Sequence, residues 1–164
     1  ATCHENHAIQ TPGDFMLGLG DKAVCSTCHT AGDKGGKTAV EMRMLIESLG
    51  AETDKAGAIL LQADHAGVEV SQAQFDLNGA KDALVKARTA VHSYMVEPVK
   101  HEVEAGLAIS AKAYARGVRA MDELRLRRTW LGVVLVVILA LIAGLVMKIR
   151  QTDRRPVAGS PPNH

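Results

Sequence analysis

The sequence predicts an all-α fold with a loop-rich N-terminal segment, a long helical hairpin or coiled-coil stalk, and a single C-terminal transmembrane helix. Three observations lead to this prediction. Apolar residues recur at heptad spacing over most of residues 38–128. An uncharged, almost wholly aliphatic run covers residues 129–147. The first 37 residues show neither pattern, and we therefore divide the chain into 1–37, 38–128, a membrane segment at 129–149, and a tail at 150–164.

The N-terminal segment contains the run Cys25-Ser26-Thr27-Cys28-His29. This Cys-x-x-Cys-His spacing is typical of covalent c-type haem attachment, in which two thiols bind the porphyrin and the adjacent histidine ligates the iron. We therefore expect Cys25 and Cys28 to hold haem c and His29 to be its proximal ligand. The alternatives are a zinc site, which usually needs a second Cys/His pair, and a thioredoxin-like redox pair, which needs a βαβ context.

A second, incomplete motif is predicted at the start of the chain. Ala1-Thr2-Cys3-His4 completes another Cys-x-x-Cys-His run if a cysteine precedes Ala1. We expect a truncated second haem c site, with Cys3 as a covalent attachment residue and His4 as the proximal ligand, and further haem domains upstream. The alternative is a lone Cys-His pair without a cofactor.

Other residues are candidates for the distal iron position. His7 lies three residues after His4 and is placed to ligate the iron of the neighbouring haem rather than that of its own. His92 and His101 flank Pro98 and are weaker distal candidates, because such histidines are more often solvated or packed. Methionine would raise the reduction potential relative to bis-histidine ligation. The methionine candidates are Met16, Met42 and Met44.

Local signals in residues 38–128 place three helices. A capping box at Thr38–Glu41 predicts a helix from about Ala39, and Gly67 is a plausible stop. A second capping box begins at Ser71, where Val70 and Phe75 form a predicted hydrophobic staple. Pro98 places the start of a third helix at about Glu97, which we expect to run into the membrane. The predicted apolar seams are Met42, Leu45, Leu49, Ala56, Ile59, Ala63 and Ala66, then Val70, Ala73, Leu77, Ala80, Leu84, Ala87, Val91 and Tyr94, then Val99, Val103, Ala113, Ala120 and Leu124.

The aliphatic run is long enough to span a bilayer as a helix. Roughly 18 residues at 1.5 Å per residue cover about 27 Å, close to the thickness of the hydrocarbon core. Trp130 suits the interfacial belt, and basic residues flank both ends of the run. Nucleic acid is a poor partner for this chain, because the basic residues gather at the two lipid interfaces with little aromatic interleaving. Membrane lipid is the expected partner.

The stretches Thr2–His7, Met16-Leu17 and Ala23–His29 resemble the doubled Cys-x-x-Cys-His family of multihaem c-type cytochromes, over about 30 residues. The resemblance implies closely spaced, usually bis-histidine haems that serve electron transfer, with a histidine placed as His7 is. Membrane-bound multihaem cytochromes are also similar in plan. Since haem c is attached outside the cytoplasm in this family, residues 1–128 are expected to be periplasmic and the tail cytoplasmic and disordered. The absence of the first cysteine is a departure from the family pattern.

The predicted function is that of a membrane-anchored multihaem c-type cytochrome that carries electrons between the quinone pool and a downstream redox partner. Other redox proteins and quinone are therefore expected partners. The alternatives are a single-pass haem-based sensor, an assembly or interaction subunit with a helical stalk, and a multihaem reductase with an open iron position. No nucleophile and base pair is evident, so the sequence favours an electron-transfer protein over an enzyme with its own substrate.

Overall fold

Three helices make up most of the structure, a computed structural model that describes residues 11–153. Helix α1 spans Lys34–His65, α2 spans Ser71–Ala90 and α3 spans Val96–Asp153. The short 3-10 helices η1 (Asp14–Met16) and η2 (Val24–Thr27) precede α1, and η3 (Val91–Ser93) follows α2. The described residues contain no strand, so the predicted all-α class with one long apolar helix is confirmed.

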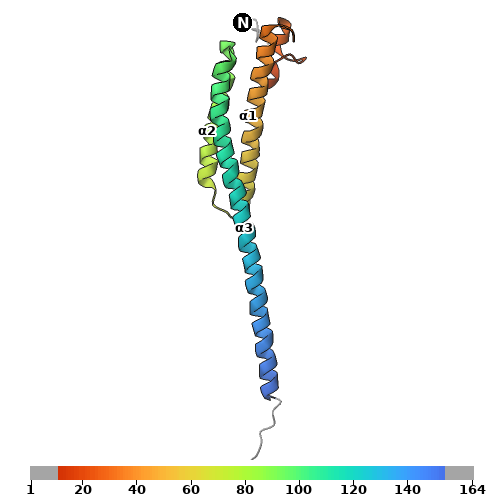
Figure 1. The fold of residues 1–164 in the computed structure, drawn as a ribbon, viewed down its shortest axis with the longest axis vertical. Coiled ribbons are helices and arrows are strands. Elements are labelled where there is room, and N and C mark those ends of the chain that lie inside the picture. Colours follow the sequence, from red (N-terminus) through yellow and green to blue (C-terminus); the bar gives the residue numbers. More distant parts are fainter. Residues whose placement is uncertain (1–10, 154–164) are drawn as a thin grey trace, which may run out of the picture. The chain divides into compact units, whose positions relative to one another are not determined.

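The chain divides into two compact units, Ala1–Met121 and Asp122–His164, and α3 contributes to both. In the first unit, α1, α2 and the first part of α3 run antiparallel in turn and pack as a three-helix bundle (Figure 1). This is the arrangement that the sequence predicts, with two antiparallel helices folded against the extension of a third. Short connections, 66–70 and 91–95, join neighbouring helices at opposite ends of the bundle.

Helix α1 begins five residues earlier than predicted. Its N-cap is Asp33, whose carboxylate accepts a hydrogen bond from the backbone N–H of Gly36 at 2.7 Å. The predicted capping box at Thr38–Glu41 is therefore wrong, because those residues already lie inside the helix. Asp33 satisfies one of the free N–H groups of the first turn, and its negative charge is favoured at the positive end of the helix dipole.

The connection between α1 and α2 follows the predicted boundaries with different capping chemistry. Gly67 has a φ of +80°, a left-handed conformation that glycine adopts without strain, directly after the helix end. Helix α2 starts at Ser71, where the Glu69 carboxylate accepts hydrogen bonds from the Ser71 backbone N–H at 2.9 Å and from its hydroxyl. These bonds lower the pKa of Glu69. The predicted staple is wrong, because Val70 is buried while Phe75 is 71% exposed.

The connection between α2 and α3 contains Tyr94, a residue with a left-handed backbone conformation. This residue has a φ of 57°, which makes it the only non-glycine residue in the described chain with a left-handed backbone. That conformation costs roughly 1–2 kcal/mol in a residue with a Cβ. It ends η3 and allows α3 to begin at Val96, one residue before the predicted start. Tyr94 is 73% exposed and does not continue the α2 seam, which is a correction to the predicted apolar row.

The core of α1 follows the predicted heptad, with alternate members shifted by one residue. Met42, Leu49, Ala56 and Ala63 are buried as expected. Their partners in the seam are Ile46, Thr53 and Leu60, whereas Leu45 and Ile59 are half-buried. Three helices meet in this core, so α1 packs against two partner helices. The position of the second partner decides which of two adjacent residues points inward. The shift also fills the gap in the predicted row between Leu49 and Ala56, because Thr53 is buried there and its neighbour Glu52 is exposed.

Close approach of α3 to α1 depends on small residues. A Cβ at Gly106 would lie 2.7 and 2.8 Å from the two Leu49 methyl carbons, and a Cβ at Gly117 would lie 2.6 Å from Cγ2 of Ile59. Between these two contacts, the hydroxyls of Thr53 and Ser110 form a buried hydrogen bond with an Oγ–Oγ distance of 3.0 Å. This pair satisfies two polar groups inside an otherwise apolar interface.

The second unit contains the apolar part of α3. All residues of 129–149 are exposed, as expected for a segment that is covered by lipid rather than by protein. Helix α3 is the one helix in residues 11–153 that is long and apolar enough to cross a membrane. At the start of this unit, Arg125 pairs with Asp122 at 3.6 Å and Arg127 with Glu123 at 2.6 Å.

Candidate functional site

The Cys-x-x-Cys-His run forms a compact turn on η2. The backbone N–H groups of Cys28 and His29 both donate to the carbonyl of Cys25, at 3.2 and 2.9 Å. Ser26 closes the start of the turn by donating from its hydroxyl to the Ala23 carbonyl at 2.6 Å. Both cysteines are free thiols, Cys25 half-buried and Cys28 exposed. The turn therefore presents two thiols and one imidazole from five consecutive residues.

His29 is oriented by the N-cap of α1. Its Nδ1 lies 3.2 Å from Oδ1 of Asp33, which leaves Nε2 as the ring nitrogen available to a metal. The same carboxylate also accepts from the backbone N–H of Thr30 at 2.6 Å and from the Thr30 hydroxyl at 3.2 Å. Hydrogen bonds from the backbone of Thr30 and Gly36 are the main reasons that the pKa of Asp33 falls to about 2. One carboxylate thus caps the helix and fixes the histidine.

Two glycines in the first turn of α1 let the motif lie against the helix. A Cβ on Gly35 would collide with the imidazole ring of His29, and a Cβ on Gly36 would collide with the carbonyl of Thr30. Glycine-rich sequence is typical of linkers, but the structure places both of these glycines in the helix. Their role is to bring the His29 ring onto the helix surface, where a side chain would exclude it.

A cavity of about 700 Å³ lies beside the motif, within the range typical of ligand sites. Cys25, Cys28 and His29 form one part of its wall. The remaining lining is mainly apolar, with a few charged residues at the margin. It comes from the N-terminal segment (Pro12, Gly13, Asp14, Met16, Leu17, Val24), from α1 (Lys34, Gly35, Thr38, Ala39, Met42), and from the end of α2 and its connection to α3 (Arg88, Val91, His92, Tyr94).

His92 lines the same cavity as the motif, although 63 residues separate it from His29 in sequence. Its Nδ1 lies 3.0 Å from the carbonyl oxygen of Thr89. A carbonyl only accepts, so Nδ1 is the donor in this contact. His101 does not line this cavity; it is 83% exposed and lies 3.6 Å from the carboxylate of Glu102. Of the two histidines that flank Pro98, the structure thus places His92 at the cavity of the motif and His101 away from it.

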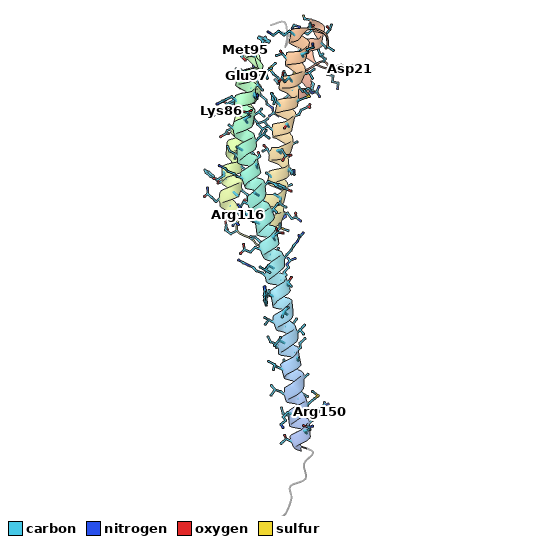
Figure 2. The ribbon with its side chains drawn as sticks, in the orientation of Figure 1. Asp21, Lys86, Met95, Glu97, Arg116 and Arg150 are labelled. Atoms are coloured by element: carbon cyan, nitrogen blue, oxygen red, sulfur yellow. The ribbon has the colours of Figure 1, made fainter. Side chains whose placement is uncertain are left out.

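Figure 2 places this region at one end of the bundle. Asp21 of the N-terminal segment and Met95 and Glu97 at the start of α3 lie at that end. Among the methionine candidates, Met16 and Met42 line the cavity, and Met44 is 59% exposed and does not. Met42 also belongs to the bundle core. The predicted second site (Cys3, His4 and His7) lies outside the described residues.

Two of the residues that line the cavity form an ion pair. Arg88 on α2 donates from Nε to Oδ1 of Asp14 at 2.8 Å and from Nη2 to Oδ2 at 2.7 Å. This two-point contact joins the N-terminal segment to α2 across 74 residues of sequence and raises the pKa of Arg88. Asp14 and Arg88 were not identified from the sequence, since no local pattern links them.

The residues of the cavity fit a covalently attached haem. Two thiols at the required spacing, one imidazole oriented by a carboxylate and a largely apolar wall are the elements such a group needs. Within residues 11–153, no group of three or more His, Cys, Asp or Glu side chains forms a site for a bare metal ion. Haem iron takes only axial ligands from the protein, because the porphyrin supplies the others.

No family model, curated protein or solved structure matches this chain.

Asp33 makes the stability of the bundle depend on pH. A carboxylate whose pKa is about 2 in the folded chain and near 3.8 when unfolded stabilises the fold above pH 4. This contribution is lost as the pH falls from about 4 to about 2. We expect Asp33→Ala to lower the melting temperature at pH 5, and the difference from the parent to shrink across that window. Thermal unfolding of haem-free Cys25→Ser/Cys28→Ser protein, followed by circular dichroism in detergent, measures this.

The control for Asp33 is Asp54→Ala, which removes an exposed carboxylate in the middle of the same helix. It changes helix propensity without removing a cap, and its melting difference from the parent is expected to stay constant from pH 5 to pH 2. A constant difference for Asp33→Ala as well would contradict the assigned role of that carboxylate.

Proposed function

We propose that this chain is a membrane-anchored c-type cytochrome segment that binds haem covalently through Cys25 and Cys28 and carries electrons on the extracytoplasmic side of a membrane. The observation that carries the proposal is a single cavity lined by both thiols, by His29 and by His92. A haem held there would supply one-electron chemistry at its iron. The protein supplies attachment, axial ligands and the apolar surroundings that tune the potential.

In this proposal His29 is the proximal ligand. Asp33 holds its Nδ1, a contact that fixes the orientation of the ring. Gly35 gives the ring room against α1. The orientation of the imidazole therefore comes from the protein's own groups.

His92 is the proposed distal ligand. It reaches the cavity from the α2–α3 connection, whereas the motif reaches it from the N-terminal segment. The carbonyl of Thr89 accepts a hydrogen bond from Nδ1, and Nε2 is the nitrogen that would bind the iron. Ligation by His29 and His92 would hold the iron between two separate elements of the fold. His101 is not retained in this role.

The apolar part of α3 is the proposed membrane anchor, with the helical bundle on the periplasmic side and the tail in the cytoplasm. The support is the exposed aliphatic run at 129–147 and the requirement of c-type haem attachment for an extracytoplasmic compartment. The quinone pool is the proposed source or sink of electrons, and other redox proteins are the proposed partners. A second haem at Cys3 and His4 remains part of the proposal, with His7 as the alternative to His92 for the distal position of the haem at Cys25 and Cys28.

Production of the full chain in a host competent for c-type haem maturation tests the proposal. In a Cys3→Ser background, the intact mass is expected to increase by one haem, and the denatured, reduced protein to show the absorption bands of a thioether-linked haem. The Cys25→Ser/Cys28→Ser variant in the same background is the matched control and is expected to gain no mass. Parent protein that folds and carries no covalent haem would refute the proposal.

A further inference from the structure

The cavity has a charged margin that the proposed attachment chemistry does not use. Besides the histidines, its lining carries one carboxylate, Asp14, and two cations, Lys34 and Arg88. A haem carries two propionate carboxylates, and placing a carboxylate against a largely apolar cavity is costly unless hydrogen-bond donors meet it. The positions of the cations therefore bear on how such an occupant is oriented.

Of the two cations, Arg88 has the more firmly fixed orientation. Asp14 accepts one hydrogen bond from Nε and one from Nη2, at 2.8 and 2.7 Å, and thereby fixes the plane of the guanidinium. An arginine has five N–H donors, so three remain for a second acceptor. Asp14 is the more buried partner, with 25% of its side chain exposed against 48% for Arg88. Lys34 has no orienting carboxylate partner in the described structure, and its ammonium is a point charge on a flexible stem.

We propose that Arg88, held in place by Asp14, binds a propionate carboxylate of the haem attached at Cys25 and Cys28. The inference rests on the proposed function and adds to it the residue that fixes the orientation of the haem. Arg88 is a binding residue in this scheme, and Asp14 is a positioning residue that acts through it. A planar fork that already holds one carboxylate loses little further entropy when it binds a second.

The competing interpretation is that the Asp14–Arg88 pair only fastens the N-terminal segment to the bundle. Arg43 provides a matched control for this interpretation. It also contacts the N-terminal segment, donating from Nη1 to the Leu17 carbonyl at 3.3 Å, and it also pairs with a carboxylate, Glu47, at 2.7 Å. Arg43 does not line the cavity. A fastening role would make the effects of Arg88→Met and Arg43→Met alike.

The experiment compares Arg88→Met, Arg88→Lys and Arg43→Met in the full-length Cys3→Ser protein loaded with haem. The readouts are the reduction potential and the propionate bending band in the resonance Raman spectrum. Arg88→Met removes a positive charge and leaves Asp14, which favours the oxidised iron. We expect the reduction equilibrium to fall about tenfold, equivalent to about 59 mV for one electron, and the propionate band to shift. Arg88→Lys should restore the potential in part, and Arg43→Met should change neither readout.

Asp14→Asn keeps the test decisive if Arg88→Met fails to mature. This variant keeps the cation and weakens the contact that orients it, so we expect the propionate band to shift in the same direction as in Arg88→Met, by a smaller amount. A propionate band unchanged in Asp14→Asn would contradict the positioning role of Asp14. If the reduction potential and the propionate band are both unchanged in Arg88→Met, with haem still bound, the inference about Arg88 is overturned and the proposed function is not. Absence of covalent haem from the Cys3→Ser parent would instead overturn the proposed function, and the inference with it.

Discussion

Leu49→Ala is expected to lower the free energy of unfolding of the bundle by about 2–5 kcal/mol, the range for a fully buried leucine. Leu49 is completely buried, and its two methyl groups lie where a side chain on Gly106 of α3 would begin. Removing them leaves a cavity between α1 and α3 that the helices can close only in part. Chemical unfolding of the full chain in detergent, followed by circular dichroism, measures the loss.

The same contact predicts a partial rescue. Gly106→Val alone is expected to destabilise by about 1–3 kcal/mol, because its Cβ would lie within 3 Å of both Leu49 methyl carbons. In Leu49→Ala/Gly106→Val, the valine occupies the space that the leucine left, and the loss should be smaller than the sum of the two single effects by about 1 kcal/mol or more. Strict additivity would show that the two residues do not share this space.

Gly50→Ala is the matched control for these substitutions. Gly50 lies next to Leu49 in α1, and a Cβ there would meet nothing within 4 Å. Without a clash, alanine should stabilise the helix by about 0.5–1 kcal/mol. A loss of stability in Gly50→Ala would indicate that the contact distances around Leu49 do not describe the packing.

The second large effect is expected from His92→Ala in the haem-loaded Cys3→Ser protein. If His92 is the distal ligand, its removal vacates one axial position of the iron, and the oxidised protein should change from a low-spin to a high-spin species. Electronic absorption and electron paramagnetic resonance spectra measure this change. The covalent attachment at Cys25 and Cys28 should be unaffected, so that the mass of the loaded protein falls only by the side-chain difference.

His101→Ala serves as the control for this substitution. His101 belongs to the same end of the bundle, is strongly exposed, and does not line the cavity of the motif. Its removal should leave the spin state as it is. An unchanged spectrum in His92→Ala would remove His92 from the proposed ligand set, and a change in His101→Ala alone would reverse the assignment.

Two of the three helix starts could be predicted from local signals to within one residue. Ser71 was predicted for α2 and observed, and α3 begins at Val96, next to the predicted Glu97. Both starts depend on nearby residues: the Glu69 carboxylate accepts hydrogen bonds from Ser71, and Pro98 lies in the first turn of α3. The start of α1 was missed because two glycines, Gly35 and Gly36, resemble a linker in sequence, although they are required in the helix by the close approach of the motif.

The seam of α1 shows the limit of periodicity. A heptad pattern identifies the face that is buried, but Leu45 and Ile46 are both apolar neighbours on that face. Only the positions of α2 and α3 decide that Ile46 is fully buried and that Leu45 is half-buried. The same limit applies to the site. Asp33 lies near the motif in sequence and could have been recognised as an N-cap, whereas Asp14 and Arg88 meet only after the bundle has folded.

The hydroxyl pair of Thr53 and Ser110 determines the axial register of the bundle. The neighbouring core positions on α3 are Gly106 and Ala113, which offer no hydrogen-bonding side chain. Sliding α3 along α1 by one turn, about 5.4 Å, would therefore leave two buried hydroxyls unpaired, at about 1–3 kcal/mol each. This penalty selects one vertical alignment from several that an alanine-rich interface would otherwise tolerate. Because His29 adjoins the start of α1 and His92 precedes the start of α3, the hydroxyl pair also sets how far apart the two imidazoles stand.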